Sequence, residues 1–171
     1  MLTEILSNKS AKPKEKTETI CQLVSKKEVS IKDLIAFAST AKDPNKATCV
    51  EALEFASKQD PKIVDISAFE FVTKCLDEKA PRIKWEAAKV IGNTAHLFPN
   101  KLDKAISGLL TNSEHTGTVV RWAAAFALGE IVKLKGKHNK DLIPALEAII
   151  LREEKNSIRK IYQAALKKVL G

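Results

Sequence analysis

Residues 83–92 read IKWEAAKVIG, and residues 120–129 read VRWAAAFALG. At a shift of 37 positions, the two segments align an aliphatic residue, a cation, a tryptophan, two alanines, an aliphatic pair and a glycine in the same order. Weaker copies follow at a spacing of 38, because Ile158 and Arg159 continue the series and Lys46 precedes it. Four units at this interval indicate an array of stacked helical repeats.

The helical period runs through nearly the whole chain, since apolar residues recur at three- and four-residue spacing. Pro44, Pro61 and Pro81 are placed at predicted helix starts, where the missing N–H costs little. We expect a short helical turn near residues 2–6 and nine main helices. The nine are predicted at residues 14–26, 30–41, 44–57, 61–76, 81–97, 101–112, 118–134, 140–152 and 157–170.

Each unit is predicted to be a helical hairpin, and a single hairpin cannot bury its own apolar stripe. The alanine pairs of the second helices allow close packing between neighbouring hairpins. We therefore predict an all-α fold, organised as one domain over residues 1–171. Its expected parts are an N-terminal cap over residues 1–28 and repeats at about 30–58, 61–98, 100–135 and 139–170.

The second helix of the third unit resembles the HEAT repeats of the phycobilisome-lyase type. That family's second helix reads approximately apolar-Arg-x-x-Ala-Ala-x-Ala-Leu-Gly-x-Ile. The matching residues are Val120, Arg121, Ala124, Ala125, Ala127, Leu128, Gly129 and Ile131. The resemblance extends over residues 30–170 and implies a right-handed α-α superhelix, a HEAT-like solenoid whose concave face is lined by second helices. Such arrays serve as scaffolds in many settings, so the fold does not specify the function.

The resemblance also implies an aspartate in the turn between the two helices, paired with the cation of the second helix. Asp77 precedes Lys84 in this way. Asn112 and Arg152 occupy the equivalent positions before Arg121 and the next cation. We therefore expect less complete neutralisation of the cations in the last two units.

Composition agrees with a helical array, because the chain has only six glycines and six prolines and is 5% aromatic, which argues against an all-β sandwich or barrel. The net charge is +8, of which +7 lies within residues 61–171, and this excess admits an anionic partner without identifying one. No apolar run approaches the roughly 18 residues of a membrane helix, and the N-terminus lacks a secretory apolar region. We expect no membrane insertion and a cytoplasmic location.

Familiar catalytic motifs are absent, since the chain contains no GxxxxGK[ST], GxGxxG, GxSxG or HExxH. The cysteines form no CxxC and are expected to be small buried side chains, and the histidines lack metal-ligand spacing. These residues are Cys21, Cys49, Cys75, His96, His115 and His138. The prediction is a non-enzymatic protein without a catalytic, metal or cofactor site.

Trp85 and Trp122 occupy the same position in consecutive units, and Phe126 follows one helical turn after the second tryptophan. If the rings face solvent, they form a concave patch with basic neighbours. The alternative is that both rings pack between helices and serve the core. The candidate partner-binding residues are Trp85, Lys89, Trp122, Phe126, Lys84 and Arg121.

A second basic cluster lies in the segment KLKGKHNK at residues 133–140 and on the last helix, where it is either a solvated edge or an anion-facing rim. Its cations are Lys133, Lys135, Lys137, Lys140, Arg159, Lys160, Lys167 and Lys168.

Three functions follow from these features, in order of preference. The first is a scaffold that binds a protein partner on its concave face. The second is a nucleic-acid-binding protein, distantly like the HEAT-like DNA alkylation-repair glycosylases. A lyase-like role has only the repeat in its favour. The oligomeric state is left open.

Overall fold

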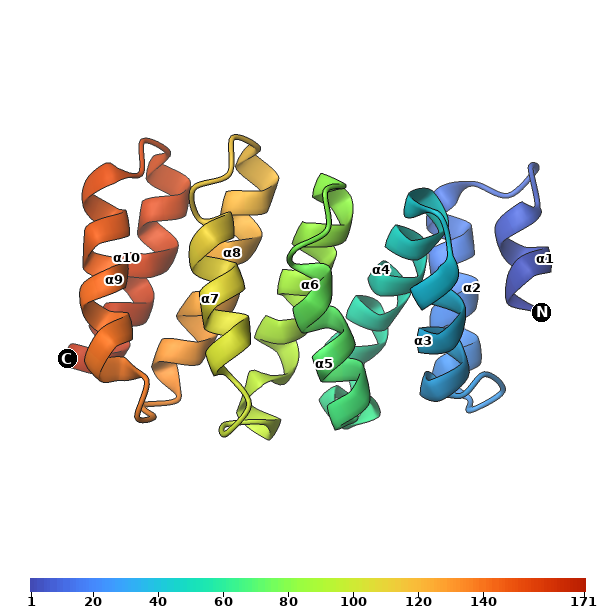
Figure 1. Cartoon of the computed structure of the whole chain (residues 1–171), viewed down its shortest axis with the longest axis horizontal. Helices are drawn as coiled ribbons and strands as arrows, with labels where there is room; N and C mark the ends of the chain where they lie inside the picture. Colours follow the sequence, from blue (N-terminus) through green and yellow to red (C-terminus); the bar gives the residue numbers. More distant parts are fainter.

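Paired helices stack along one direction in the computed structural model, which describes all 171 residues (Figure 1). The chain contains no strand. The helices are α1 (Leu2–Ser7), α2 (Pro13–Ser25), α3 (Ile31–Thr40), α4 (Asp43–Gln59), α5 (Ile66–Cys75), α6 (Pro81–Thr94), α7 (Asp103–Asn112), α8 (Thr118–Lys133), α9 (Asn139–Arg152) and α10 (Asn156–Leu170), with 3-10 turns at Pro61–Ile63 and Ala95–Leu97.

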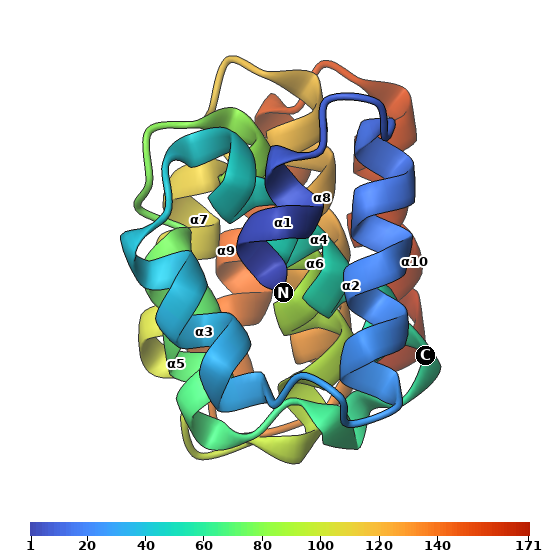
Figure 2. The ribbon, with the colours of Figure 1, turned by 90° about the vertical axis from the view of Figure 1, so that its right-hand side faces the viewer.

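The helices form two layers, which are seen end-on in Figure 2. One layer holds α3, α5, α7 and α9, and the other holds α2, α4, α6, α8 and α10. The short α1 packs beside α2 at the N-terminal end. The predicted all-α superhelix is thereby confirmed, and the predicted helices appear within a few residues of their expected bounds.

The predicted helix over residues 61–76 is wrong in its first part. Pro61–Ile63 forms a 3-10 turn, and Val64 continues in extended backbone with its side chain buried. Asp65 then caps α5, since its carboxylate accepts a hydrogen bond of 2.8 Å from the Ala68 N–H. Two aspartates compete as caps within five residues, and the second one sets the helix start.

One hydrophobic core runs the length of the stack and contains 43 buried residues. The most extensive helix contacts join neighbours within the even-numbered layer, which is α2, α4, α6, α8 and α10. The alanine pairs explain this, because Ala87, Ala88, Ala124 and Ala125 are at most 1% exposed. Small side chains let helix backbones approach closely, and interiors packed in this way have little free space.

A glycine of α6 makes room for an aromatic ring of α8. A Cβ atom added to Gly92 of α6 would lie 2.3 Å from the ring of Phe126 on α8. No carbon pair tolerates that separation. The phenyl ring therefore rests in the space that a side chain at position 92 would occupy.

The three cysteines are buried, as predicted. Burial raises the pKa of the Cys49 and Cys75 thiols to about 12 and also raises the pKa of Cys21. These thiols are protonated at neutral pH and act as small apolar groups.

Polar contacts between repeats follow the turn edge, where the two helices of each hairpin are joined. Lys46 of α4 is paired with Glu78, which lies in the turn of the following hairpin. Arg121 of α8 donates to the carboxylate of Glu153 in the next turn, with an Nε–Oε2 distance of 3.1 Å. Lys84 of α6 meets the Asn112 side chain at 3.4 Å, at the end of α7. We call these three contacts the turn ladder.

The turn ladder corrects the expected pairing within a repeat. Asp77 is exposed and forms no ion pair with Lys84, whose ammonium instead donates to the Leu76 carbonyl oxygen at 3.0 Å. The expectation of an incompletely neutralised Arg121 is also wrong, because its acid comes from the following repeat. Arg159 agrees with the expectation, since its guanidinium meets only the Glu153 carbonyl oxygen, at 3.2 Å.

Glu153 is the most enclosed carboxylate of the turn ladder. Burial alone would raise its pKa, but the hydrogen bonds from Arg121 and from the Lys155 backbone N–H outweigh burial and lower it. A carboxylate whose pKa is lower in the folded chain than in the unfolded chain stabilises the fold above its unfolded pKa. That contribution is lost as the pH falls through the folded pKa.

The first prediction concerns Gly92. Replacing Gly92 by alanine forces the Phe126 ring to move, and we expect the free energy of unfolding to fall by about 1–3 kcal/mol in urea titrations. Gly136→Ala is the matched control, because nothing lies within 4 Å of an added Cβ there. In a Phe126→Leu background the cost of Gly92→Ala should shrink. An equal cost in both backgrounds would contradict the proposed clash.

The second prediction concerns Glu153. Glu153→Gln should lower the free energy of unfolding by about 2 kcal/mol at neutral pH, since a hydrogen-bonded charge is lost. The difference from wild type should diminish as the pH falls below the ordinary glutamate value of 4.5, where the wild-type carboxylate also becomes protonated. Glu154→Gln, at an exposed neighbour, serves as the control. A difference that does not change with pH would refute the ionic role.

Candidate partner-binding surface

The outer surfaces of α4, α6, α8 and α10, which we call the even-helix face, carry the predicted aromatic residues. Trp122 of α8 is 39% exposed and stacks on Phe126, with ring centroids 6.1 Å apart and planes inclined by 8°. The i, i+4 spacing on one helix brings the two rings together. We call the solvent-facing surface of these two rings the aromatic plate.

Trp85 differs from its counterpart one repeat later. It is half-buried and packs against the core of the stack. Its indole Nε1 donates a hydrogen bond of 2.9 Å to Glu86 Oε1. The two tryptophans occupy the same repeat position in different environments. Trp122 faces solvent, which is one of the two alternatives from the sequence, and Trp85 packs against the core, which is the other.

The predicted basic neighbours are all engaged by other groups. Lys89 lies 3.6 Å from Glu86 and 3.8 Å from Glu54, between two carboxylates. Lys84 and Arg121 belong to the turn ladder. Of the six predicted site residues, the structure therefore joins Trp122 and Phe126 directly and assigns intramolecular partners to the three cations.

Acidic side chains at the contact between α4 and α6, two of them buried, were missed by sequence reasoning. Glu51 pairs with Arg82, and Glu54 and Glu86 share Lys89. Burial raises the pKa of Glu86, and one of its oxygens, Oε2, has no hydrogen-bond partner. The i, i+3 spacing of Glu51 and Glu54 was the available signal, because that spacing places both on one side of a helix.

A small hollow of about 190 Å³ opens between α8 and α10, next to the aromatic plate. Phe126 and Ile161 contribute apolar walls, and Gly129, Ala164 and Ala165 form a floor without large side chains. The rim carries the Glu130–Lys133 pair, 2.7 Å apart, and Lys168. We call this space the α8–α10 hollow.

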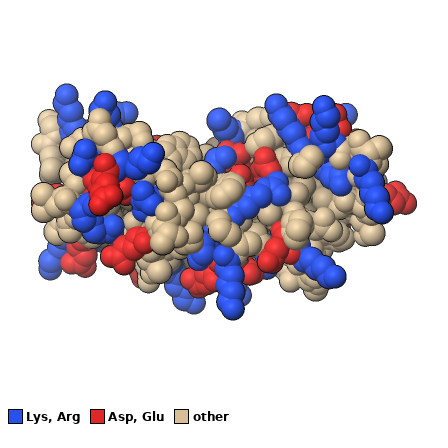
Figure 3. Space-filling model, turned by 90° about the horizontal axis from the view of Figure 1, so that it is seen from above, with Lys and Arg blue, Asp and Glu red and all other residues tan.

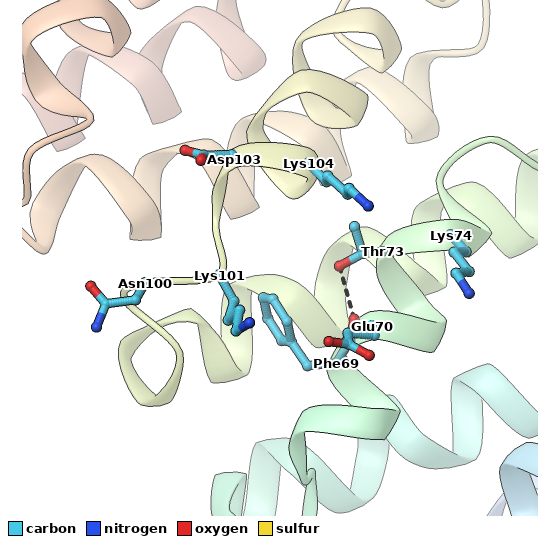
Figure 4. Close-up of a pocket in the computed structure, with 8 residues that line it drawn as sticks. All are labelled: Phe69, Glu70, Thr73, Lys74, Asn100, Lys101, Asp103 and Lys104. Atoms are coloured by element: carbon cyan, nitrogen blue, oxygen red, sulfur yellow. Dashed lines mark hydrogen bonds between the residues drawn. The ribbon is translucent and has the colours of Figure 1, made fainter.

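A larger hollow of about 400 Å³ lies on the other layer, between the ends of α5 and α7 (Figure 4). Lys74, Lys101 and Lys104 surround it together with Glu70 and Asp103, and Phe69 is its only apolar residue. Charges of both signs thus line an open polar depression that is separate from the even-helix face.

Charges of both signs also mix along the turn edge, which Figure 3 views directly. Acidic groups lie among lysines and arginines there, and no continuous stripe of one sign is visible on this edge. In the segment 133–140, Lys133 pairs with Glu130, whereas Lys135 and Lys137 are exposed.

No group of three or more His, Cys, Asp or Glu side chains is arranged to hold a metal ion. None of the helices combines the length and the apolar character needed to cross a membrane.

Comparisons with known proteins identify the fold. No protein-family model and no curated protein matches the chain. A designed armadillo repeat protein in complex with the peptide (KR)4 has a TM-score of 0.77 at 20% identity, over 98% of this chain and 80% of that one. Computationally designed armadillo repeat proteins for modular peptide recognition give 0.75 at 19% identity, with the same coverage of 98% and 80%.

A natural protein is similar to the same degree. The complex of CpcE and CpcF of phycocyanin lyase from Nostoc sp. gives a TM-score of 0.71 at 18% identity, over 96% of this chain and 95% of that chain. At these identities the similarity establishes architecture alone. The chain has the helical repeat solenoid fold of the armadillo and HEAT type.

Proposed function

We propose that this chain is a non-enzymatic interaction module of the HEAT-like kind, which binds an extended segment of a protein partner along its even-helix face. The observation that carries the proposal is the aromatic plate. Trp122 is 39% exposed although it stacks on Phe126, so a large apolar surface faces water. Exposed aromatic anchors of this type dominate the binding energy of protein interfaces.

The similar designed proteins support this proposal, since one of them is in complex with a peptide and others were made for peptide recognition. Solenoids present an extended surface that follows the stacking direction, which suits an extended chain segment. A cytoplasmic location is part of the proposal, because three thiols outside any disulfide fit a reducing compartment.

Nucleic acid is the alternative partner from the sequence, and the part of the even-helix face around the two tryptophans is poorly suited to it. Arg82 pairs with Glu51, and Lys89 lies between Glu54 and Glu86, so the cations beside Trp85 are already neutralised. Binding of this class also needs cations that are free to contact phosphates. Lys84, Lys89 and Arg121 all have partners within the chain.

The third prediction tests the aromatic plate. A displayed library of random peptides of about twelve residues, which span about 40 Å when extended, should yield peptides that bind the chain. Trp122→Ala should weaken their binding about 30-fold, the effect of losing an interface hot spot, as measured by fluorescence anisotropy. Leu151→Ala is the matched control, because Leu151 is 89% exposed on α9 in the other layer.

Two results would overturn the proposal. The first is that no peptide is enriched whose binding depends on Trp122. The second is that random single-stranded DNA binds instead at low salt, and that its affinity falls steeply as the salt concentration rises.

A further inference from the structure

The even-helix face differs in ion pairing from one end to the other. In its α4–α6 part, Glu51 pairs with Arg82, and the buried Glu54 and Glu86 share Lys89. The helix α10, at the other end, contains four cations and no acidic residue. The four are Arg159, Lys160, Lys167 and Lys168. None of the four forms an ion pair, so a segment lying over α10 meets positive charge that the chain itself does not neutralise.

The α8–α10 hollow lies at the cationic end. Its floor stays open because Gly129, Ala164 and Ala165 carry at most a methyl group. A Cβ added to Gly129 would already be 3.4 Å from the Ala165 methyl group, so the two helices leave little room beneath the floor. The Phe126 ring belongs to both the wall of this hollow and the aromatic plate. An apolar side chain placed here would extend the contact made at Trp122.

Lys168, one of the two lysines at the rim, has no ion-pair partner within the chain. Glu130 is the one carboxylate at the hollow, and Lys133 holds it at 2.7 Å. Lys168 forms no ion pair and no hydrogen bond through its ammonium group, although it lies on the rim. An exposed ammonium beside an apolar depression favours a ligand that combines an apolar group with a negative charge.

We propose that the α8–α10 hollow receives an aliphatic side chain of the partner segment, and that Lys168 binds a carboxylate next to that side chain in the same segment. The partner would then be an acidic peptide with an aliphatic anchor. This inference rests on the proposed function, because it specifies the ligand of the same face. The acidic part of the segment is then placed over α10, whose cations form no ion pairs within the chain.

The fourth prediction uses the peptides selected above. We expect the Trp122-dependent peptides to carry an aliphatic residue adjacent to aspartate or glutamate. Lys168→Glu should weaken their binding about tenfold at about 50 mM salt and by much less at about 500 mM salt, because salt screens an exposed charge. Ala164→Leu, at an exposed position on the floor, should weaken binding about tenfold by filling the hollow.

Lys167→Glu is the matched control, because it makes the same charge change on α10 at a residue that does not line the hollow. We expect less than about a threefold effect from it. Circular dichroism of the three variants checks that the helices are retained.

The outcomes separate this inference from the proposed function. Peptides that need Trp122 but tolerate both Ala164→Leu and Lys168→Glu would overturn the inference and leave the proposed function intact. Trp122-dependent peptides enriched in lysine and arginine would do the same. An equal loss with Lys167→Glu and Lys168→Glu would show a general charge effect and would also overturn it. The absence of any Trp122-dependent peptide would overturn both.

Discussion

Close packing between successive second helices is the constraint on which this structure depends. The most extensive helix contacts are those within the even-numbered layer, and alanines and glycines form them. One hairpin buries too little apolar surface to be stable alone, and stacking supplies the remainder. Because the backbones approach so closely, the Phe126 ring of α8 packs over Gly92 of α6 and lies beside Trp122 at the surface. The small residues Gly129, Ala164 and Ala165 leave the α8–α10 hollow open in the same way.

The turn ladder complements this packing with directional contacts. Apolar contacts between regular helices tolerate sliding along the helix axis, whereas an ion pair holds one turn at a defined height against the preceding helix. Lys46–Glu78 and Arg121–Glu153 join residues 32 positions apart and so link consecutive hairpins. The same contacts keep these cations away from external anions. The net charge of +8 is consequently a poor guide to function, because part of it is used between repeats.

Much of the fold could be predicted from the sequence, because the repeat at 83–92 and 120–129 shows two things. It shows the periodicity of a helix, and its spacing shows that helical hairpins follow one another along the chain. The helix break before Asp65 could not, since two aspartates offered equally good caps. The partner of Arg121 also could not, because Glu153 comes from the next hairpin and depends on the stacking offset. The repeat did identify Trp122 and Phe126. It could not separate Trp85 from Trp122, because Trp85 packs against the core and donates to Glu86, whereas Trp122 lies at the surface against Phe126. The α8–α10 hollow arises from small residues on two helices, and no local pattern marks it.

The contact between Gly92 and Phe126 links two levels of organisation in the molecule. The glycine belongs to one hairpin and lies out of solvent, whereas the ring belongs to the next hairpin and forms part of the surface. The orientation of this surface ring therefore depends on the backbone of the neighbouring hairpin. A larger residue at position 92 would displace the ring at position 126, so substitutions at these two positions of successive repeats are coupled.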